Sequence, residues 1–227
     1  MKSLPYDVTT ATQALQRADP VLGQVIAMVG PCKLELETTR SLFEALMRAI
    51  IYQQLHARAA SAIHHRVNAL FSGPPTPTGL MTIPDESLRA AGLSAAKLAA
   101  LRDLAVKAGT GTVPTLAQAR RIADDELIER LTAVRGIGPW TVHMLLLFRL
   151  GRPDVMPVGD FAIRLAFSRL YRKGRDTKPA TLLRQAERWR PWRSVASWYL
   201  WRSVAPEPPV TANDLARKPA AGVDSVR

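Results

Sequence analysis

The chain has 227 residues, of which 47% are hydrophobic, and 31 Lys and Arg residues against 19 Asp and Glu residues give a formal net charge of +12. This length is enough for a substantial core in one domain or two closely joined lobes, and the charge indicates a polyanionic partner, nucleic acid ahead of an anionic membrane surface. The single cysteine, Cys32, excludes a disulfide framework, a zinc knuckle or a cysteine-held iron–sulfur cluster within one chain.

No segment reaches the roughly 20 apolar residues that a membrane span needs. The first residues, MKSLPYDVTTATQ, also lack an apolar run of signal-peptide length. We therefore expect a cytoplasmic protein that associates with the nucleoid and not with a membrane.

Hydrophobic residues recur at helical spacing through most of the chain. In chain order the pattern predicts helices at 41–53 and 56–71, a turn-rich loop at 72–79, a short helix after Pro84, and further helices at 95–108, 122–133, 139–150, 160–172, 178–189 and 192–203. Alternating β-branched segments are nearly absent, so the fold class is predicted to be all-α. Residues 205–227 have little apolar content and predict a flexible C-terminal tail.

The segment RGIGP at 135–139 separates two helical patterns and predicts a helix–hairpin–helix motif. Gly136 and Gly138 permit a tight turn that directs Ile137 into the core, and Pro139 suits the first turn of the second helix. Free N–H groups at that helix start can bind a DNA phosphate without sequence preference. A Gly-X-Gly turn alone is equally typical of an ordinary helix–helix connection.

Five segments together resemble the helix–hairpin–helix (HhH-GPD) DNA glycosylase superfamily, in its AlkA-like 3-methyladenine DNA glycosylase II branch. They are LMRAIIYQQLHARAASAI, GLSAAKLAALRDLA, LTAVRGIGPWTVHMLLLF, MPVGDFAIRLAF and WRPWRSVASWYLW. The resemblance implies a glycosylase domain over residues 1–204 with a cleft between two helical lobes: lobe one at roughly 38–152, and lobe two at roughly 1–37 plus 153–204. AlkA-like enzymes can carry an additional N-terminal β domain, which we do not expect here.

By this resemblance Asp160 is the catalytic residue. A carboxylate in a dry site stabilises the positive charge that develops on the sugar and can orient or deprotonate the attacking water. Asp160 also precedes a predicted helix, where aspartate is a common N-cap, and the two roles are compatible. The competing carboxylate, Asp154, lies in an Arg-Pro-Asp loop that predicts a solvated side chain.

The resemblance also implies a pocket for the flipped base, in which aromatic faces favour cationic alkylated bases. Its expected members are Trp140, Met144, Phe161 and Trp201. Three further tryptophans are expected to pack in the core: Trp189, Trp192 and Trp198. Relatives that also nick the backbone carry a lysine at the position of Trp140, so the resemblance implies hydrolysis without a lyase step.

Contacts to DNA are expected from two loops that the resemblance brings to the cleft. Gln54 or Leu55 would fill the gap left by the flipped nucleotide, and Gln53 would contact the orphaned pairing partner. The other expected DNA-binding residues belong to the hairpin: Arg135, Gly136, Gly138 and Thr141.

The resemblance implies no required cofactor. The backbone carbonyls of Thr132, Val134 and Ile137 are expected to hold a structural Na⁺ or K⁺ when DNA is bound, and no iron–sulfur cluster is expected. The expected partner is double-stranded DNA that contains alkylated bases, and the protein is expected to be a monomer.

The predicted function is a monofunctional DNA glycosylase for alkylated bases of the 3-methyladenine and 7-methylguanine class in base-excision repair. The alternative is a non-catalytic helix–hairpin–helix DNA-binding module, which would need the hairpin and the charge but not Asp160. A glycosylase for oxidised or mismatched bases is disfavoured by Trp140.

Overall fold

The computed structural model describes residues 3–204, which contain thirteen α-helices, one π-helical segment, one 3-10 helix and no β-strand. The helices are α1 (Val8–Ala18), α2 (Pro20–Val29), α3 (Leu42–Tyr52), α4 (Ala57–Asn68), α5 (Pro77–Thr82), α6 (Asp85–Ala90), α7 (Ala95–Gly109), α8 (Leu116–Ala119), α9 (Asp124–Thr132), α10 (Pro139–Leu145), η1 (Leu146–Leu150), α11 (Phe161–Tyr171), α12 (Pro179–Ala186), η2 (Glu187–Trp189) and α13 (Arg193–Val204). The predicted all-α fold class is confirmed. The predicted tail at 205–227 lies outside the described residues.

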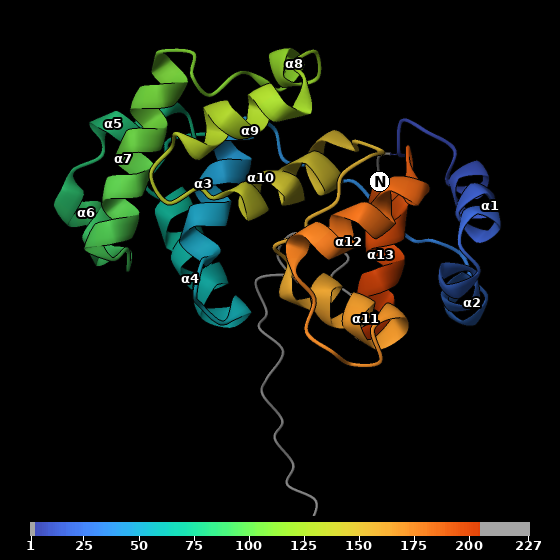
Figure 1. Ribbon diagram of the computed structural model, residues 1–227. Helices are drawn as coiled ribbons and strands as arrows, with labels where there is room; N and C mark the ends of the chain where they lie inside the picture. The colour runs from blue at the N-terminus through green and yellow to red at the C-terminus, as the bar shows by residue number, and fades with distance from the viewer. Residues whose placement is uncertain (1–2, 205–227) are drawn as a thin grey trace, which may run out of the picture.

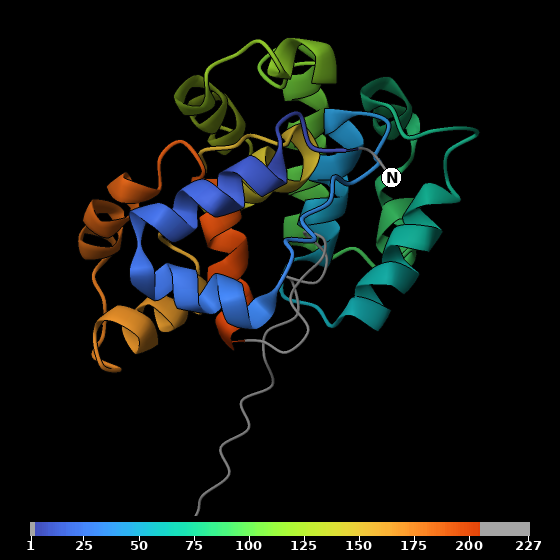
Figure 2. The same ribbon diagram turned by 90° about the vertical axis from the view of Figure 1, so that its right-hand side faces the viewer.

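The helices form two groups, which lie side by side in Figure 1. In one group α7 packs against α3, α5 and α6, and α9 packs against α10. In the other, α13 packs against α11, α2 and α1. Figure 2 shows α1 and α2 in front of α13, so the first two helices of the chain complete the group that is built mainly from its last three.

Four helices were not predicted: α1, α2, α5 and α8. Each begins at a capping side chain. Asp7 caps α1, Asp19 caps α2, and Thr115 forms a capping box with Gln118 at α8. The loop predicted at 72–79 is wrong in its second half, because Thr76 caps α5 and Pro77 occupies its first turn.

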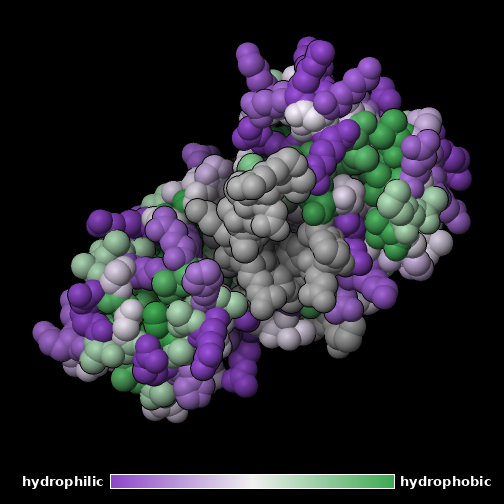
Figure 3. Space-filling model, turned by 90° about the horizontal axis from the view of Figure 1, so that it is seen from below, coloured by the Kyte–Doolittle hydropathy of each residue, from purple (hydrophilic) through white to green (hydrophobic). Residues whose placement is uncertain are grey.

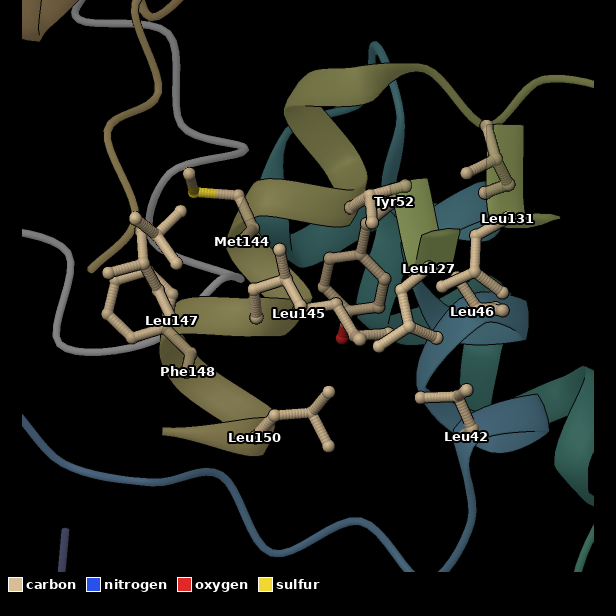
Figure 4. Packing of buried hydrophobic residues seen from close by; sticks show 14 of the residues in the cluster. Leu42, Leu46, Tyr52, Leu127, Leu131, Met144, Leu145, Leu147, Phe148 and Leu150 are labelled. Atoms are coloured by element: carbon tan, nitrogen blue, oxygen red, sulfur yellow. The ribbon is translucent and has the colours of Figure 1, made fainter. Parts of the chain in front are cut away.

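The core of the first group packs α3 against the two helices of the hairpin. Figure 4 shows Leu46 and Tyr52 of α3 beside Leu127 of α9 and Leu145 of α10. Among the tryptophans expected in the core, Trp189 and Trp198 are buried and Trp192 is partly buried against the core. None of the helices in residues 3–204 is both long enough and apolar enough to cross a membrane.

The π-helical segment η1 is hydrogen-bonded to the chain segment that links α2, in one helix group, to α3, in the other. Arg149 is only 3% exposed, and its guanidinium donates to the backbone carbonyls of Glu37 and Thr39. The Glu37 N–H donates to the Phe148 carbonyl at 2.7 Å. The segment that links α2 to α3 is therefore fixed along the end of the hairpin's second helix. Such π-turns are frequent near functional sites.

Candidate active site

The helix–hairpin–helix motif is formed by α9, the turn at 133–138 and α10. Gly136 has a φ of +79°, which L side chains rarely adopt, whereas Gly138 has a φ of −102° and open space around it. The side chain of Ile137 is 4% exposed, as expected for a residue that anchors the turn in the core. Gly138 precedes Pro139 at the start of α10 without a side-chain cap. The first N–H groups of α10 thus lack a side-chain acceptor.

Two contacts hold the hairpin in place from outside the motif. The Arg135 N–H donates to Asp103 of α7 at 2.7 Å, and Asp103 also accepts from Lys107. Gln53 donates from Nε2 to the Gly136 carbonyl at 2.8 Å. The expected wedge loop and the hairpin are therefore joined directly, while the Arg135 side chain stays exposed.

The loop after α3 places its three expected DNA-binding residues differently. Gln53 is partly buried and bonded to the hairpin, Leu55 is partly buried against the core, and Gln54 is exposed. Gln54 also has a φ of +57°, a conformation that costs a non-glycine residue roughly 1–2 kcal/mol. Strain of this kind is concentrated at functional sites, which favours Gln54 over Leu55 as the residue that projects into DNA.

A Gln54→Gly variant should separate this strain from its function. Glycine adopts the left-handed conformation freely, so the free energy of unfolding should stay unchanged or rise by up to about 1 kcal/mol. Base release from duplex DNA should slow by about tenfold or more, because no side chain fills the gap in the stack. Single-stranded alkylated DNA has no such gap and provides the control; equal slowing on both substrates would rule out a wedge role.

A cavity of about 300 Å³ lies between α3, the hairpin and the 37–39 connection. Its lining comes from α3, the loop after it, the hairpin turn, α10 and η1. The residues are Glu37, Ala45, Leu46, Arg48, Ala49, Tyr52, Gln53, Gln54, Gly136, Gly138, Trp140, Thr141, Met144, Leu145 and Arg149. Trp140 and Met144 thus lie together, as expected. Tyr52 was missed as a lining residue, although its helical spacing from Arg48 was a usable signal. The Arg48 guanidinium lies over its ring, 5.1 Å from the centroid.

Asp160 is held at the N-terminus of α11 by three hydrogen bonds. Oδ1 accepts from the Ile163 N–H at 2.9 Å and from the indole of Trp201 at 3.0 Å. Oδ2 accepts from the indole of Trp140 at 2.8 Å. The residue is 6% exposed, and no ion pair forms on it within residues 3–204. The carboxylate is therefore buried without a counter-charge and is oriented by neutral donors.

This arrangement leaves Asp160 one acceptor position. A carboxylate has about four lone-pair sites, and the three hydrogen bonds use two on Oδ1 and one on Oδ2. Beside it, Gly159 is exposed, and a Cβ atom there would meet nothing within 4 Å. Oδ2 can thus receive one further donor, and the backbone next to it is open to a close approach.

Two residues expected in the pocket are placed elsewhere. Trp201 is 1% exposed and stacks on Phe148 with ring centroids 5.8 Å apart, so it supports Asp160 from within the core. Phe161 is 66% exposed, because the first residue of α11 points away from the buried side of the helix. Neither residue lines the cavity. Asp160 does not line it either, but the indole of Trp140, which does, is hydrogen-bonded to Asp160.

The prediction that Asp154 is solvated is wrong. Its carboxylate accepts from Arg193 at 2.6 Å and from Arg190 at 2.6 Å, and it is 23% exposed. The Arg-Pro-Asp loop is drawn against the start of α13 by these ion pairs. Asp154 is consequently occupied as a structural ion-pair partner, whereas Asp160 is not.

An all-helical fold in two groups, with a hairpin beside an aromatic cavity and a buried carboxylate at the next helix start, defines the class of helix–hairpin–helix base-excision proteins. Residues 47–191 match the family described as HhH-GPD superfamily base excision DNA repair protein. The chain belongs to this superfamily.

Relatives support the assignment over most of the chain. DNA-3-methyladenine glycosylase 1 of Schizosaccharomyces pombe is 41% identical over 163 residues, which cover 71% of this chain and 72% of that protein. The structure of the Schizosaccharomyces pombe 3-methyladenine DNA glycosylase in complex with abasic DNA aligns with a TM-score of 0.72 and 37% identity, covering 85% of this chain and 95% of that one. A DNA-3-methyladenine glycosidase from Bacillus halodurans aligns with a TM-score of 0.80 and 33% identity, covering 86% and 89%.

Proposed function

We propose that the protein is a monofunctional DNA glycosylase that removes alkylated bases of the 3-methyladenine and 7-methylguanine class from double-stranded DNA in base-excision repair. The observation that carries the proposal is the Asp160 carboxylate, which is buried without a cation and shares the indole of Trp140 with the cavity. The relatives named as 3-methyladenine glycosylases support the same substrate class.

The cavity has the chemistry of a site for a flipped, cationic base. Trp140 and Tyr52 supply aromatic surface, and Met144 supplies a polarisable thioether. The Trp140 N–H donates to a carboxylate, which polarises the indole and increases the electron density of its face. A methylated, positively charged purine is favoured at such a face and is also a good leaving group.

Asp160 then acts on the sugar. As the C1′–N bond breaks, its electron pair stays with the base and neutralises it, while positive charge develops on the deoxyribose ring. The carboxylate stabilises that charge because its indole partners keep it oriented in a site with little water. The free acceptor position on Oδ2 can take the proton of a water that adds to C1′, which completes hydrolysis.

The hairpin supplies binding to the DNA backbone in this scheme. The uncapped start of α10 and the exposed Arg135 face a phosphate, and Gln54 enters the duplex. A Na⁺ or K⁺ held by the carbonyls of Thr132, Val134 and Ile137 would add a positive charge at this point. The residues fit such an ion, since the carbonyls of Thr132 and Ile137 accept no hydrogen bond within residues 3–204 and Val134 accepts only one, from Ile137.

We further propose that the protein acts as a cytoplasmic monomer on the nucleoid and needs no cofactor for hydrolysis. The second candidate function, a DNA-binding module without activity, shares the hairpin and the charge. It gives no reason for two indoles to converge on one uncompensated carboxylate.

The proposal is tested by chromatography of the bases released from methylated duplex DNA. We expect 3-methyladenine and 7-methylguanine in the soluble fraction and an intact sugar–phosphate strand, because Trp140 offers no amine for a lyase step. Duplex binding without any released base would favour the DNA-binding module. Strand cleavage at the abasic product would contradict the monofunctional assignment.

A further inference from the structure

The positive charge of the chain is concentrated in one region that lies outside the hairpin. Residues 164–190 contain nine Lys and Arg residues and two acids, a net +7 of the total of +12. They form most of α11, the connection at 172–178, α12 and η2. Figure 3, which views the molecule from below Figure 1, shows hydrophilic side chains at both ends of that face, whereas the concentration of positive charge at 164–190 follows from the sequence.

Most of these cations are not used to hold the fold. Within residues 3–204, Arg164 pairs with Asp176, and Arg190 pairs with Asp154 and Glu187. The other seven are exposed and form no ion pair in the described part of the chain: Arg169, Arg172, Lys173, Arg175, Lys178, Arg184 and Arg188. Mutual repulsion among them costs stability, which indicates that an anion offsets it when bound.

Two of these arginines line a shared hollow. A depression of about 330 Å³ lies between the end of α11 and α12, bounded by Phe167, Tyr171, Arg172, Thr181, Arg184 and Gln185. Arg172 and Arg184 come from different elements and both line this hollow, together with Thr181. Guanidinium and hydroxyl donors of this kind match the oxygens of a phosphate.

The hollow lies at the opposite end of α11 from Asp160. Asp160 caps the start of α11, and Arg172 follows its last residue. Eleven helical residues span about 16 Å. This length exceeds the rise of about 3.4 Å per nucleotide along a strand several times, so a phosphate bound at the hollow would belong to DNA that flanks the reacting sugar.

We propose that the α11–α12 surface, defined as Arg172, Thr181 and Arg184, binds a backbone phosphate of the DNA that flanks the lesion. This inference rests on the proposed function. It extends the interface from the hairpin, on one helix group, to the other helix group, so that each group contributes a contact to the duplex.

The test is the salt dependence of binding to undamaged duplex DNA by Arg172→Gln/Arg184→Gln. Each lost phosphate contact lowers the slope of log K against log salt by about 0.9, so loss of this one phosphate site should give a slope smaller by about 0.9 and binding about tenfold weaker at 0.15 M salt. The matched control is Arg120→Gln/Arg121→Gln. Both control residues are exposed and follow α8, which lies at the opposite edge of the molecule in Figures 1 and 2.

The outcomes are distinct. A wild-type slope for the α11–α12 variant, or an equal loss in both variants, overturns the inference. Base release at saturating DNA should match the wild-type rate, because the hollow does not touch Asp160. A wild-type protein that binds duplex DNA but releases no base would contradict the proposed function. The salt dependence of binding would still test whether the α11–α12 surface contacts DNA.

Discussion

Asp160→Asn should reduce the rate of base release by about a hundredfold to ten-thousandfold while the protein still binds duplex DNA. Loss of one preorganised electrostatic group in an active site costs about 10²–10⁴ in rate, and here the lost charge is the one that faces the developing cation. Asparagine still caps α11, but its amide cannot accept from both indoles at once, so a modest loss of stability should accompany the loss of activity. Single-turnover release from methylated duplex measures the effect.

The control for this prediction is Asp154→Asn, which removes the nearby carboxylate that the structure places in ion pairs with Arg190 and Arg193. Its rate on folded protein should stay close to wild type. A loss of activity shared equally by both variants would show that the carboxylates act through the fold and not at the reacting sugar.

Asp19→Ala should lower the free energy of unfolding by about 3–5 kcal/mol, the largest stability effect that we expect from a single side chain outside the apolar core. Asp19 is 1% exposed, and its Oδ2 accepts from Tyr171, Gln185 and Trp189 at 2.9–3.0 Å. Its Oδ1 caps α2. Removal of the carboxylate leaves three buried donors without an acceptor. Chemical denaturation measures the loss.

The matched control is Asp7→Ala, since Asp7 caps α1 in the same way but is exposed and accepts only from its own helix start. Its effect should be clearly smaller. Equal losses in the two variants would mean that Asp19 acts only as a cap and does not join α2 to α11, α12 and η2.

The contribution of Asp19 to folding stability should also depend on pH. Burial tends to raise the pKa of Asp19, but the donors from Trp189, Leu22, Gln185 and Tyr171 outweigh it, so the pKa in the folded protein lies below the usual value. A carboxyl with a lowered folded pKa stabilises the fold above its unfolded pKa of about 3.9, and this contribution is lost as pH falls through the folded value. Stability should therefore drop in acid for the wild type and more weakly for Asp19→Asn.

The sequence by itself determined the features that depend on neighbouring residues. The all-α class follows from helical hydrophobic spacing, and the hairpin follows from the order of helix, Gly136, Ile137 and Pro139. The place of Asp160 before a helix was visible for the same reason, since caps and turns are set within a few residues. Two of the helices that escaped prediction, α5 and α8, have only six and four residues, which is too short for a helical period to show. The other two, α1 and α2, were missed although their caps, Asp7 and Asp19, are local features.

Only the tertiary structure decided which distant groups meet. The partners of Asp19 are more than 150 positions away in the chain, and Asp160 receives its indoles from 20 positions upstream and 41 positions downstream. No local pattern encodes such distances, because they result from how helix faces pack. The same packing buried Trp201, exposed Phe161, paired Asp154 and brought Tyr52 to the cavity. Helical periodicity shows which face of a helix is apolar, but the neighbour against which that face packs is a property of the assembled core.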